Sequence, residues 1–182
     1  MAVTTSAPLH RLSLEDVFAM VRAGILEENE RVELVDGVLV ELNATGAEHR
    51  SIVKRLTKHL VLGAGDRYDV AIQDMLLTSD LGYRLPDVVI TAPEVEVVLP
   101  ETALLVIEVA QSSHARDREK RVDYASIGVD EYWIVDVVEE SIAVHTEPVD
   151  GAYRSVVVHR EGAVTSLLEG VPPIALDTLF GR

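Results

Sequence analysis

Hydrophobic and polar positions follow two different periods along this 182-residue chain, and the changes between them divide it into helices and strands. Apolar residues at helical spacing predict three helices, over about 13–24, 47–62 and 115–127. The first carries Ser13 as an N-cap residue with Asp16 three positions later, and it ends at Gly24. The third ends before Gly128, a residue suited to a helix C-terminus.

Alternating or continuous apolar runs bounded by turn residues predict strands elsewhere. The segment "RVELVDGVLVEL" (31–42) predicts a hairpin, because Asp36-Gly37 joins its two alternating runs. Further strands are predicted at "YDVAIQDMLLT" (68–78), "RLPDVVIT" (84–91), "ALLVIEVA" (103–110), "EYWIVDVV" (131–138), "SIAVHTE" (141–147) and "YRSVVVH" (153–159). The last two are expected to pair as a hairpin across "PVDG" (148–151), and Pro172-Pro173 excludes a regular helix near the C-terminus.

This order of elements predicts an α/β (α+β) fold with a mixed central β-sheet flanked by a helix on each face. The length and the 48% hydrophobic content suit a single domain over 1–182, with 1–11 as a flexible start. Apolar runs fall short of the roughly 18 to 20 residues that a membrane span needs, and the first ten residues lack the pattern of a secretion signal. We therefore expect a soluble, cytoplasmic protein.

Composition narrows the chemistry. The chain has no cysteine, which excludes disulfides, thiolate zinc sites and cysteine nucleophiles. Its net charge of -15 opposes nonspecific binding to a polyanion. Half of the sixteen basic residues nevertheless lie in two short segments, "RSIVKRLTK" (50–58) and "RDREKR" (116–121). These two basic segments are either solvated helix faces or surfaces for nucleic acid.

Glu108 interrupts the apolar strand segment 103–110. A strand of this kind is buried on both faces, and an uncompensated buried carboxylate costs several kcal/mol. The compensation can be a basic partner, a proton taken up through a raised pKa, or a metal ion shared with other acidic groups.

Asp87 follows Pro86 in the preceding strand segment, and neighbouring strands could bring its carboxylate beside that of Glu108. Two like charges about 4 Å apart repel by roughly 4 kcal/mol, so the pair requires a shared proton or a cation. Oxygen ligands favour a hard ion, Mg²⁺ or Mn²⁺. Lys120, on the next helix, could hold an attacking water or neutralise charge on a phosphate.

At these residues the chain resembles the Uma family, a branch of the PD-(D/E)xK nuclease superfamily. The resemblance rests on "PD" at 86–87, "EV" at 108–109, "SSHARDREKRVDYASIGVDEYWIVD" at 112–136, "RVELVDGVLVEL" and His49. It implies a restriction-endonuclease-like fold in which Asp87 and Glu108 bind the metal and act in catalysis.

The resemblance also shows departures from the superfamily pattern. Ala110 stands where the superfamily has its lysine, and the resemblance implies that this lysine has moved to the next helix, as Lys120 or alternatively Arg121. Gln111 stands where a serine is common. His49 matches a histidine of the family and could bind or orient a ligand, with Glu33 and Glu48 as nearby acidic candidates.

Structural alternatives remain for several of these residues. Glu108 could form a salt bridge with Arg84, and Asp117, three residues before Lys120, could simply pair with Arg121. Trp133 and Tyr132 are expected in the core, not as platforms for nucleic-acid bases.

The leading hypothesis is a metal-dependent nuclease that cuts nucleic acid, expected to be DNA, and acts as a homodimer. Its backbone contacts would come from both basic segments: Arg50, Lys54, Lys58, Arg116, Arg118 and Arg121. An alternative is a catalytically inactive binding or assembly module with the same fold. A third hypothesis is an enzyme that uses the same metal site on another phosphate ester.

Overall fold

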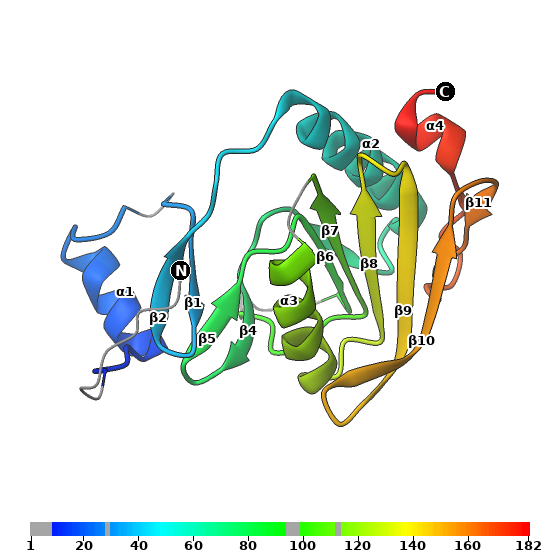
Figure 1. Ribbon diagram of the computed structural model, residues 1–182. Helices are drawn as coiled ribbons and strands as arrows, with labels where there is room; N and C mark the ends of the chain where they lie inside the picture. The colour runs from blue at the N-terminus through cyan, green and yellow to red at the C-terminus, as the bar shows by residue number, and fades with distance from the viewer. Residues whose placement is uncertain (1–8, 28–29, 94–98, 112–113) are drawn as a thin grey trace.

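The computed structural model describes residues 9–27, 30–93, 99–111 and 114–182, without the side chains of 114–118 (Figure 1). Its helices are α1 (Leu14–Arg22), α2 (Ala47–Ala64), α3 (His114–Ser126) and α4 (Leu176–Phe180). The strands up to α3 are β1 (Val32–Val35), β2 (Val38–Glu41), β3 (Asp69–Ala71), β4 (Leu76–Ser79), β5 (Gly82–Arg84), β6 (Val88–Thr91) and β7 (Leu105–Ala110). After α3 come β8 (Glu131–Asp136), β9 (Ser141–Val149), β10 (Ala152–His159), β11 (Ala163–Val164) and β12 (Ile174–Ala175).

A six-stranded sheet forms the centre, in the order β10-β9-β8-β7-β6-β3. Its strands pair antiparallel except for β7 and β8, which run parallel and are connected through α3. All six residues of β7 are buried, as the apolar run around Glu108 predicts. The mixed sheet expected from the sequence is confirmed.

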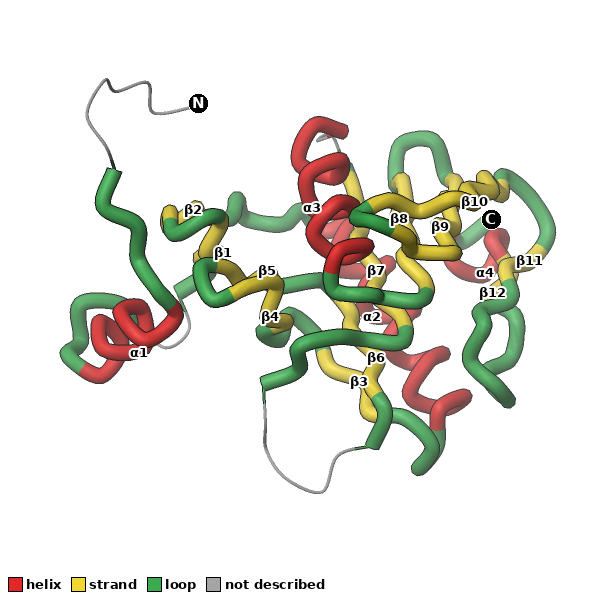
Figure 2. The backbone as a smooth tube through the Cα atoms, turned by 90° about the horizontal axis from the view of Figure 1, so that it is seen from below, coloured by secondary structure: helices red, strands yellow, loops and turns green. Residues whose placement is uncertain are grey.

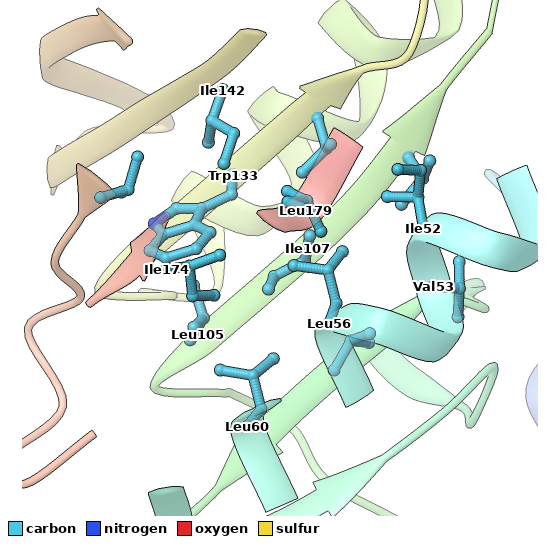
Figure 3. Close-up of a cluster of buried hydrophobic side chains, with 14 of the residues drawn as sticks. Ile52, Val53, Leu56, Leu60, Leu105, Ile107, Trp133, Ile142, Ile174 and Leu179 are labelled. Atoms are coloured by element: carbon cyan, nitrogen blue, oxygen red, sulfur yellow. The ribbon is translucent and has the colours of Figure 1, made fainter. Parts of the chain in front are cut away.

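The two long helices lie on opposite faces of this sheet (Figures 1 and 2). On one face, the apolar side of α2 packs against β6, β7, β8 and β9; Figure 3 shows Leu56 and Leu60 beside Leu105, Ile107 and Trp133. On the other face, Tyr124 of α3 clusters with Val89 of β6, Val106 of β7 and Tyr132 of β8. A helix on each face therefore follows from the alternation of side chains along the strands.

A second sheet, in the order β2-β1-β5-β4, lies beside the first and carries α1. The β1–β2 hairpin turns at Asp36 and Gly37, which have φ values of 48° and 75°. These left-handed conformations belong to the two-residue turn that the sequence predicts. The capping box of α1 between Ser13 and Asp16 is also present.

One predicted strand is wrong as a single element, and another is shorter than predicted. The segment 68–78 contributes β3 to the six-stranded sheet and β4 to the four-stranded sheet, and the segment 84–91 contains β6 after the last residue of β5. Gln73, at φ 51°, interrupts the first segment, and Pro86, which has no N–H to donate to a ladder, lies in the break of the second. Between β3 and β6 the chain therefore crosses from one sheet to the other twice, and the second crossing lies just before Asp87.

None of the helices within the described ranges is long and apolar enough to cross a membrane.

Core packing of α2 makes a first prediction. Leu56 is fully buried between α2 and the six-stranded sheet, so Leu56→Ala should lower the free energy of unfolding by about 2–5 kcal/mol. Leu62, on the same helix, is 75% exposed, and Leu62→Ala should change it by less than about 0.5 kcal/mol. Urea denaturation of both variants measures the difference. Equal losses would contradict the burial of this face of α2.

Candidate active site

Asp87 and Glu108 are brought together by the pairing of β6 with β7. These strands are antiparallel with Val88 opposite Ile107, so the continuing register places Asp87 opposite Glu108. Both side chains are buried, at 6% and 8% exposure. The carboxylates line one pocket of about 210 Å³, whose other polar residues include Arg31, His49, Gln111 and Lys120.

Glu108 is held by two donors from α3. Lys120 Nζ donates to Glu108 Oε1 at 2.8 Å, and the Tyr124 hydroxyl donates to the same oxygen at 2.7 Å. Lys120 and Tyr124 are four residues apart and so lie on one face of the helix. Both protein donors that the structure shows for this carboxylate therefore converge on a single oxygen.

Glu33 extends this network into the second sheet. Its carboxylate lies 2.9 Å from Lys120 Nζ and 3.0 Å from Arg84 Nη1, and it accepts the Leu85 N–H at 3.1 Å. Arg84 also donates to Asp123 Oδ2, through Nε at 2.8 Å. Lys120 thus lies between two buried carboxylates that come from different sheets.

The charges of this network do not balance. Four carboxylates, those of Glu33, Asp87, Glu108 and Asp123, face two cations, Arg84 and Lys120. With these groups ionised, the carboxylates outnumber the two cations by two, and Arg31, which also lines the pocket, donates to the Asn43 carbonyl at 3.5 Å. Such an excess in a buried place favours proton uptake or the binding of a cation.

Burial and the neighbouring charges both act on the pKa of Glu108. Burial raises the pKa of Glu108 to about 7, and the Asp87 charge raises it too, against the opposing effect of Lys120. Burial disfavours the ammonium of Lys120, but Glu108 and Glu33 raise the pKa of Lys120, so it stays protonated. Burial likewise opposes ionisation of Glu33, yet Lys120 and Arg84 together lower its pKa.

Asp87 is positioned by groups from three segments. His49 Nε2, from α2, lies 2.9 Å from Asp87 Oδ2, and the Val109 N–H donates to the same oxygen at 2.9 Å. The Gln73 amide lies 3.4 Å from Oδ1. His49 Nδ1 is buried and has no hydrogen-bond partner among the described residues. The ring is therefore held on one side only.

The basic segment of α2 lies next to this pocket. Its side chains border a groove of about 720 Å³, the α2 groove, lined by Arg50, Lys54, Lys58, Val61, Leu62 and Ile72. His49 and Thr45 line both the groove and the pocket, so the two cavities adjoin. These three predicted cations thus line a cavity that adjoins the pocket of the carboxylates.

The second basic segment is only partly described. The side chains of Arg116, Asp117 and Arg118 lie outside the described residues. Arg121 is half-buried and close enough to His145 to lower the pKa of that histidine, together with the larger effect of burial. It does not line the pocket, and Lys120 is the basic residue of α3 that reaches Glu108.

The structure also settles two alternatives from the sequence. The salt bridge between Glu108 and Arg84 is wrong, because Arg84 binds Glu33 and Asp123. Trp133 and Tyr132 are both fully buried, as expected of core aromatics. Gln111 is exposed at the rim, with its side chain against Gly46, the N-cap of α2.

Sequence reasoning missed Tyr124, Asp123 and Gln73 as neighbours of the site. Tyr124 could have been found, since it lies four residues after Lys120 on the same helix. Asp123 and Gln73 could not have been found from the sequence, because each contacts the site only through the three-dimensional fold.

The donor set suits a hard cation that keeps part of its water shell. Among the described residues, no group of three or more His, Cys, Asp or Glu side chains is arranged to hold a metal ion. Mg²⁺ needs fewer, because it is commonly bound through one or two carboxylates while waters and substrate oxygens complete its shell. Asp87 and Glu108 fit that requirement.

The Tyr124 hydroxyl stabilises ionised Glu108, and its removal should be measurable. Tyr124→Phe should raise the pKa of Glu108 above that of the wild type and lower the free energy of unfolding by about 1–3 kcal/mol. A carboxyl NMR titration measures the first effect. Tyr153→Phe is the matched control, since its hydroxyl donates to the Val129 carbonyl. An unchanged Glu108 pKa in Tyr124→Phe would rule out this role.

Known proteins resemble the chain in sequence and in fold. The family model Uma2, described as "Putative restriction endonuclease", matches residues 14–178. No curated protein matches the chain. A crystal structure from Anabaena variabilis ATCC 29413, described as a putative nuclease belonging to DUF820, superposes with a TM-score of 0.77 at 14% identity, covering 93% of this chain and 98% of its own. The type IIG restriction endonuclease BpuSI superposes with a TM-score of 0.43 at 16% identity, covering 78% of this chain and 17% of that one.

Proposed function

The chain belongs to the Uma2 family, and from this premise we propose that it is a metal-dependent nuclease that hydrolyses phosphodiester bonds of nucleic acid. The uncompensated charge around Glu108 carries the proposal. A buried carboxylate with a pKa near 7, beside Asp87 and with both protein donors on one oxygen, is suited to share a divalent cation.

We propose Mg²⁺ or Mn²⁺ as the cofactor, held by Asp87 and Glu108. When bound, such an ion supplies Lewis-acid chemistry, polarising the phosphate and lowering the pKa of a coordinated water. His49 and the Val109 N–H hold the Asp87 carboxylate in place, and Lys120 and Tyr124 hold that of Glu108. The chain thus fixes both ligands before substrate arrives.

Lys120 takes the part of the superfamily's lysine in this proposal. It reaches the same Glu108 carboxylate from α3 that a lysine at position 110 would approach from β7. Its ammonium can orient the attacking water and offset the charge that develops on the phosphate. Arg50, Lys54 and Lys58 would contact the nucleic-acid backbone, a local exception to the net charge of -15.

A cleavage assay tests the proposal. The wild type is incubated with supercoiled plasmid, linear duplex and single-stranded DNA or RNA, with Mg²⁺, Mn²⁺ or EDTA. We expect nicking or degradation in either metal and none in EDTA. If the protein binds these substrates without cutting any of them, the result would favour the alternative, a binding module. Ala110 and Gln111 support that alternative because they depart from the superfamily pattern.

Binding of the cation should depend on pH with a definite sign. Glu108 must be ionised to bind it, and its pKa is near 7, so binding should release a proton and strengthen as the pH rises from 6 to 8. We expect Mg²⁺ or Mn²⁺ to raise the melting temperature more at pH 8 than at pH 6. Calorimetry in buffers of different ionisation enthalpy counts the released protons. Equal stabilisation at both pH values would exclude Glu108 as a ligand.

The homodimer and the cytoplasmic location remain predictions. A homodimer is expected because cutting both strands of a duplex in one encounter requires two active sites. Sedimentation of the protein with and without a nucleic-acid duplex measures its oligomeric state.

A further inference from the structure

The α2 groove has two kinds of lining, a basic row and an apolar part that follows it along α2. Arg50, Lys54 and Lys58 follow one another at intervals of four residues, which places a positive charge about every 6 Å along the helix. Val61 and Leu62 follow this basic row on the next turn of α2, at 48% and 75% exposure, and Ile72, at 47% exposure, lines the groove as well. Clusters of this kind on a protein surface mark sites of interaction.

An occupant must match both linings. The basic row requires an occupant with repeated negative charge. Val61, Leu62 and Ile72, the apolar floor of the groove, require an occupant with apolar surface, whose burial against them is favourable. An unpaired nucleic-acid strand offers both, because its phosphates repeat along one side and its bases are free on the other. A duplex hides its bases and presents phosphates and sugars, so it would leave the apolar floor uncovered.

The groove is also continuous with the proposed active site. His49 and Thr45 line both cavities, and Gln73, which borders the groove, lies 3.4 Å from Asp87 Oδ1. A strand bound in the groove would therefore lead directly to the carboxylates. The volume of about 720 Å³ is more than three times that of the 210 Å³ pocket, so the groove could hold the part of a strand beside the phosphate to be cut.

We propose that the α2 groove binds unpaired nucleotides next to the scissile phosphate, with the basic row on the phosphates and Val61, Leu62 and Ile72 against the bases. This inference rests on the proposed nuclease function and narrows its substrate class to single-stranded or locally unpaired nucleic acid. The floor is aliphatic, so the contact reads no particular base and the binding tolerates any sequence.

Binding without metal tests the groove separately from catalysis. Fluorescence anisotropy in EDTA compares a labelled twelve-nucleotide DNA strand with its duplex at several salt concentrations. We expect the single strand to bind at least tenfold more tightly than the duplex. Lys54→Gln with Lys58→Gln should weaken binding and reduce the salt slope of the affinity by about 1.4, since each phosphate contact to a single strand contributes about 0.7.

The floor variant separates the apolar contact from charge. Leu62→Ser with Ile72→Ser should lower single-strand affinity at least fivefold, leave the salt slope unchanged and remove most of the preference over duplex. Val156→Ser with Val158→Ser is the matched control, because these valines are 49% and 45% exposed on β10. Arg22→Gln with Arg154→Gln is the control for charge. Both control pairs should bind as the wild type does.

Several outcomes would overturn the inference. Equal affinity for strand and duplex, or a floor variant that binds like the wild type, removes the unpaired strand as occupant. A change of sedimented mass in Leu62→Ser with Ile72→Ser would show that a second copy of the chain covers the groove. Binding of an acidic peptide to the groove that nucleic acid does not displace would show that its occupant is a protein. If the protein cuts duplex without preference for single strands, the nuclease function stands and the binding of unpaired nucleotides in the groove is wrong. If it binds single strands without cutting them, the binding in the groove stands and the nuclease function is wrong.

Discussion

Glu108→Gln should abolish metal-dependent cleavage, with a loss of at least about a hundredfold in rate, while the protein remains folded. Glutamine has the shape of glutamate, and its oxygen can still accept from Lys120 and Tyr124, but it carries no charge to hold a cation. The raised pKa of Glu108 means that the fold disfavours its ionised form, and Lys120 keeps Glu33 as a partner, so the free energy of unfolding at pH 8 should equal or exceed that of the wild type.

A second effect of Glu108→Gln appears in the pH dependence of stability. The folded pKa of Glu108 is raised to about 7, above the ordinary value of 4.5, so its contribution to stability is complete below pH 4.5 and is lost as the pH rises through 7. A shift of that size corresponds to roughly 3 kcal/mol. The difference in free energy of unfolding between variant and wild type should therefore grow by that order between pH 4.5 and pH 8.

Glu131→Gln is the matched control for the cleavage measurement. Glu131 is a buried carboxylate on the neighbouring strand β8, and its partners are the Trp133 indole and the Leu167 N–H. Its substitution should affect stability without removing metal-dependent cleavage. If Glu108→Gln cuts nucleic acid as fast as the wild type, the assignment of Glu108 as a metal ligand is wrong.

Lys120→Met should be the most destabilising single change at the site. Lys120 is the shared cation of Glu33 and Glu108, and removing one partner of a buried ion pair costs about 3–5 kcal/mol. Glu108 would respond by taking up a proton, so the loss of stability should be smaller at pH 5 than at pH 8. Cleavage should fall as well, even at temperatures where the variant is folded. Denaturation at both pH values and the plasmid assay measure these effects.

Arg121→Met provides the comparison for Lys120→Met. It removes the neighbouring cation, which is half-buried and lies near His145 instead of the carboxylates. We expect near wild-type cleavage from Arg121→Met and a loss from Lys120→Met. The opposite order would show that Arg121 is the functional equivalent of the superfamily's lysine.

The central part of the site could be predicted from the sequence because its signals are local. An apolar run with one glutamate predicts a strand buried on both faces, and the preceding strand supplies Asp87. Pairing of β6 with β7 then places the two carboxylates opposite each other. The family resemblance directed attention to Lys120, and the structure shows that it reaches Glu108.

The remaining part could not be predicted, because it depends on the position of the second sheet. Glu33 and Arg84 meet across more than fifty positions of sequence, and no periodicity reports such a contact. The two crossings between the sheets were also hidden, since each crossing segment has strand composition throughout. The incorrect pairing of Arg84 with Glu108 arose from the same gap, as Arg84 lies in the second sheet and is committed to Glu33 and Asp123.

The position of Lys120 between Glu108 of β7 and Glu33 of β1 has a consequence for cooperativity. Each of the two sheets contributes one of the carboxylates that hold this ammonium, so a fluctuation that separates the sheets also exposes the ammonium and dismantles the site. Any ligand that binds only the assembled site must then strengthen the attachment of the N-terminal hairpin, and amide exchange in β1 and β5 should slow on binding, although neither strand needs to touch the ligand. The stability of the hairpin against local opening would thus depend on whether a ligand is bound at the site.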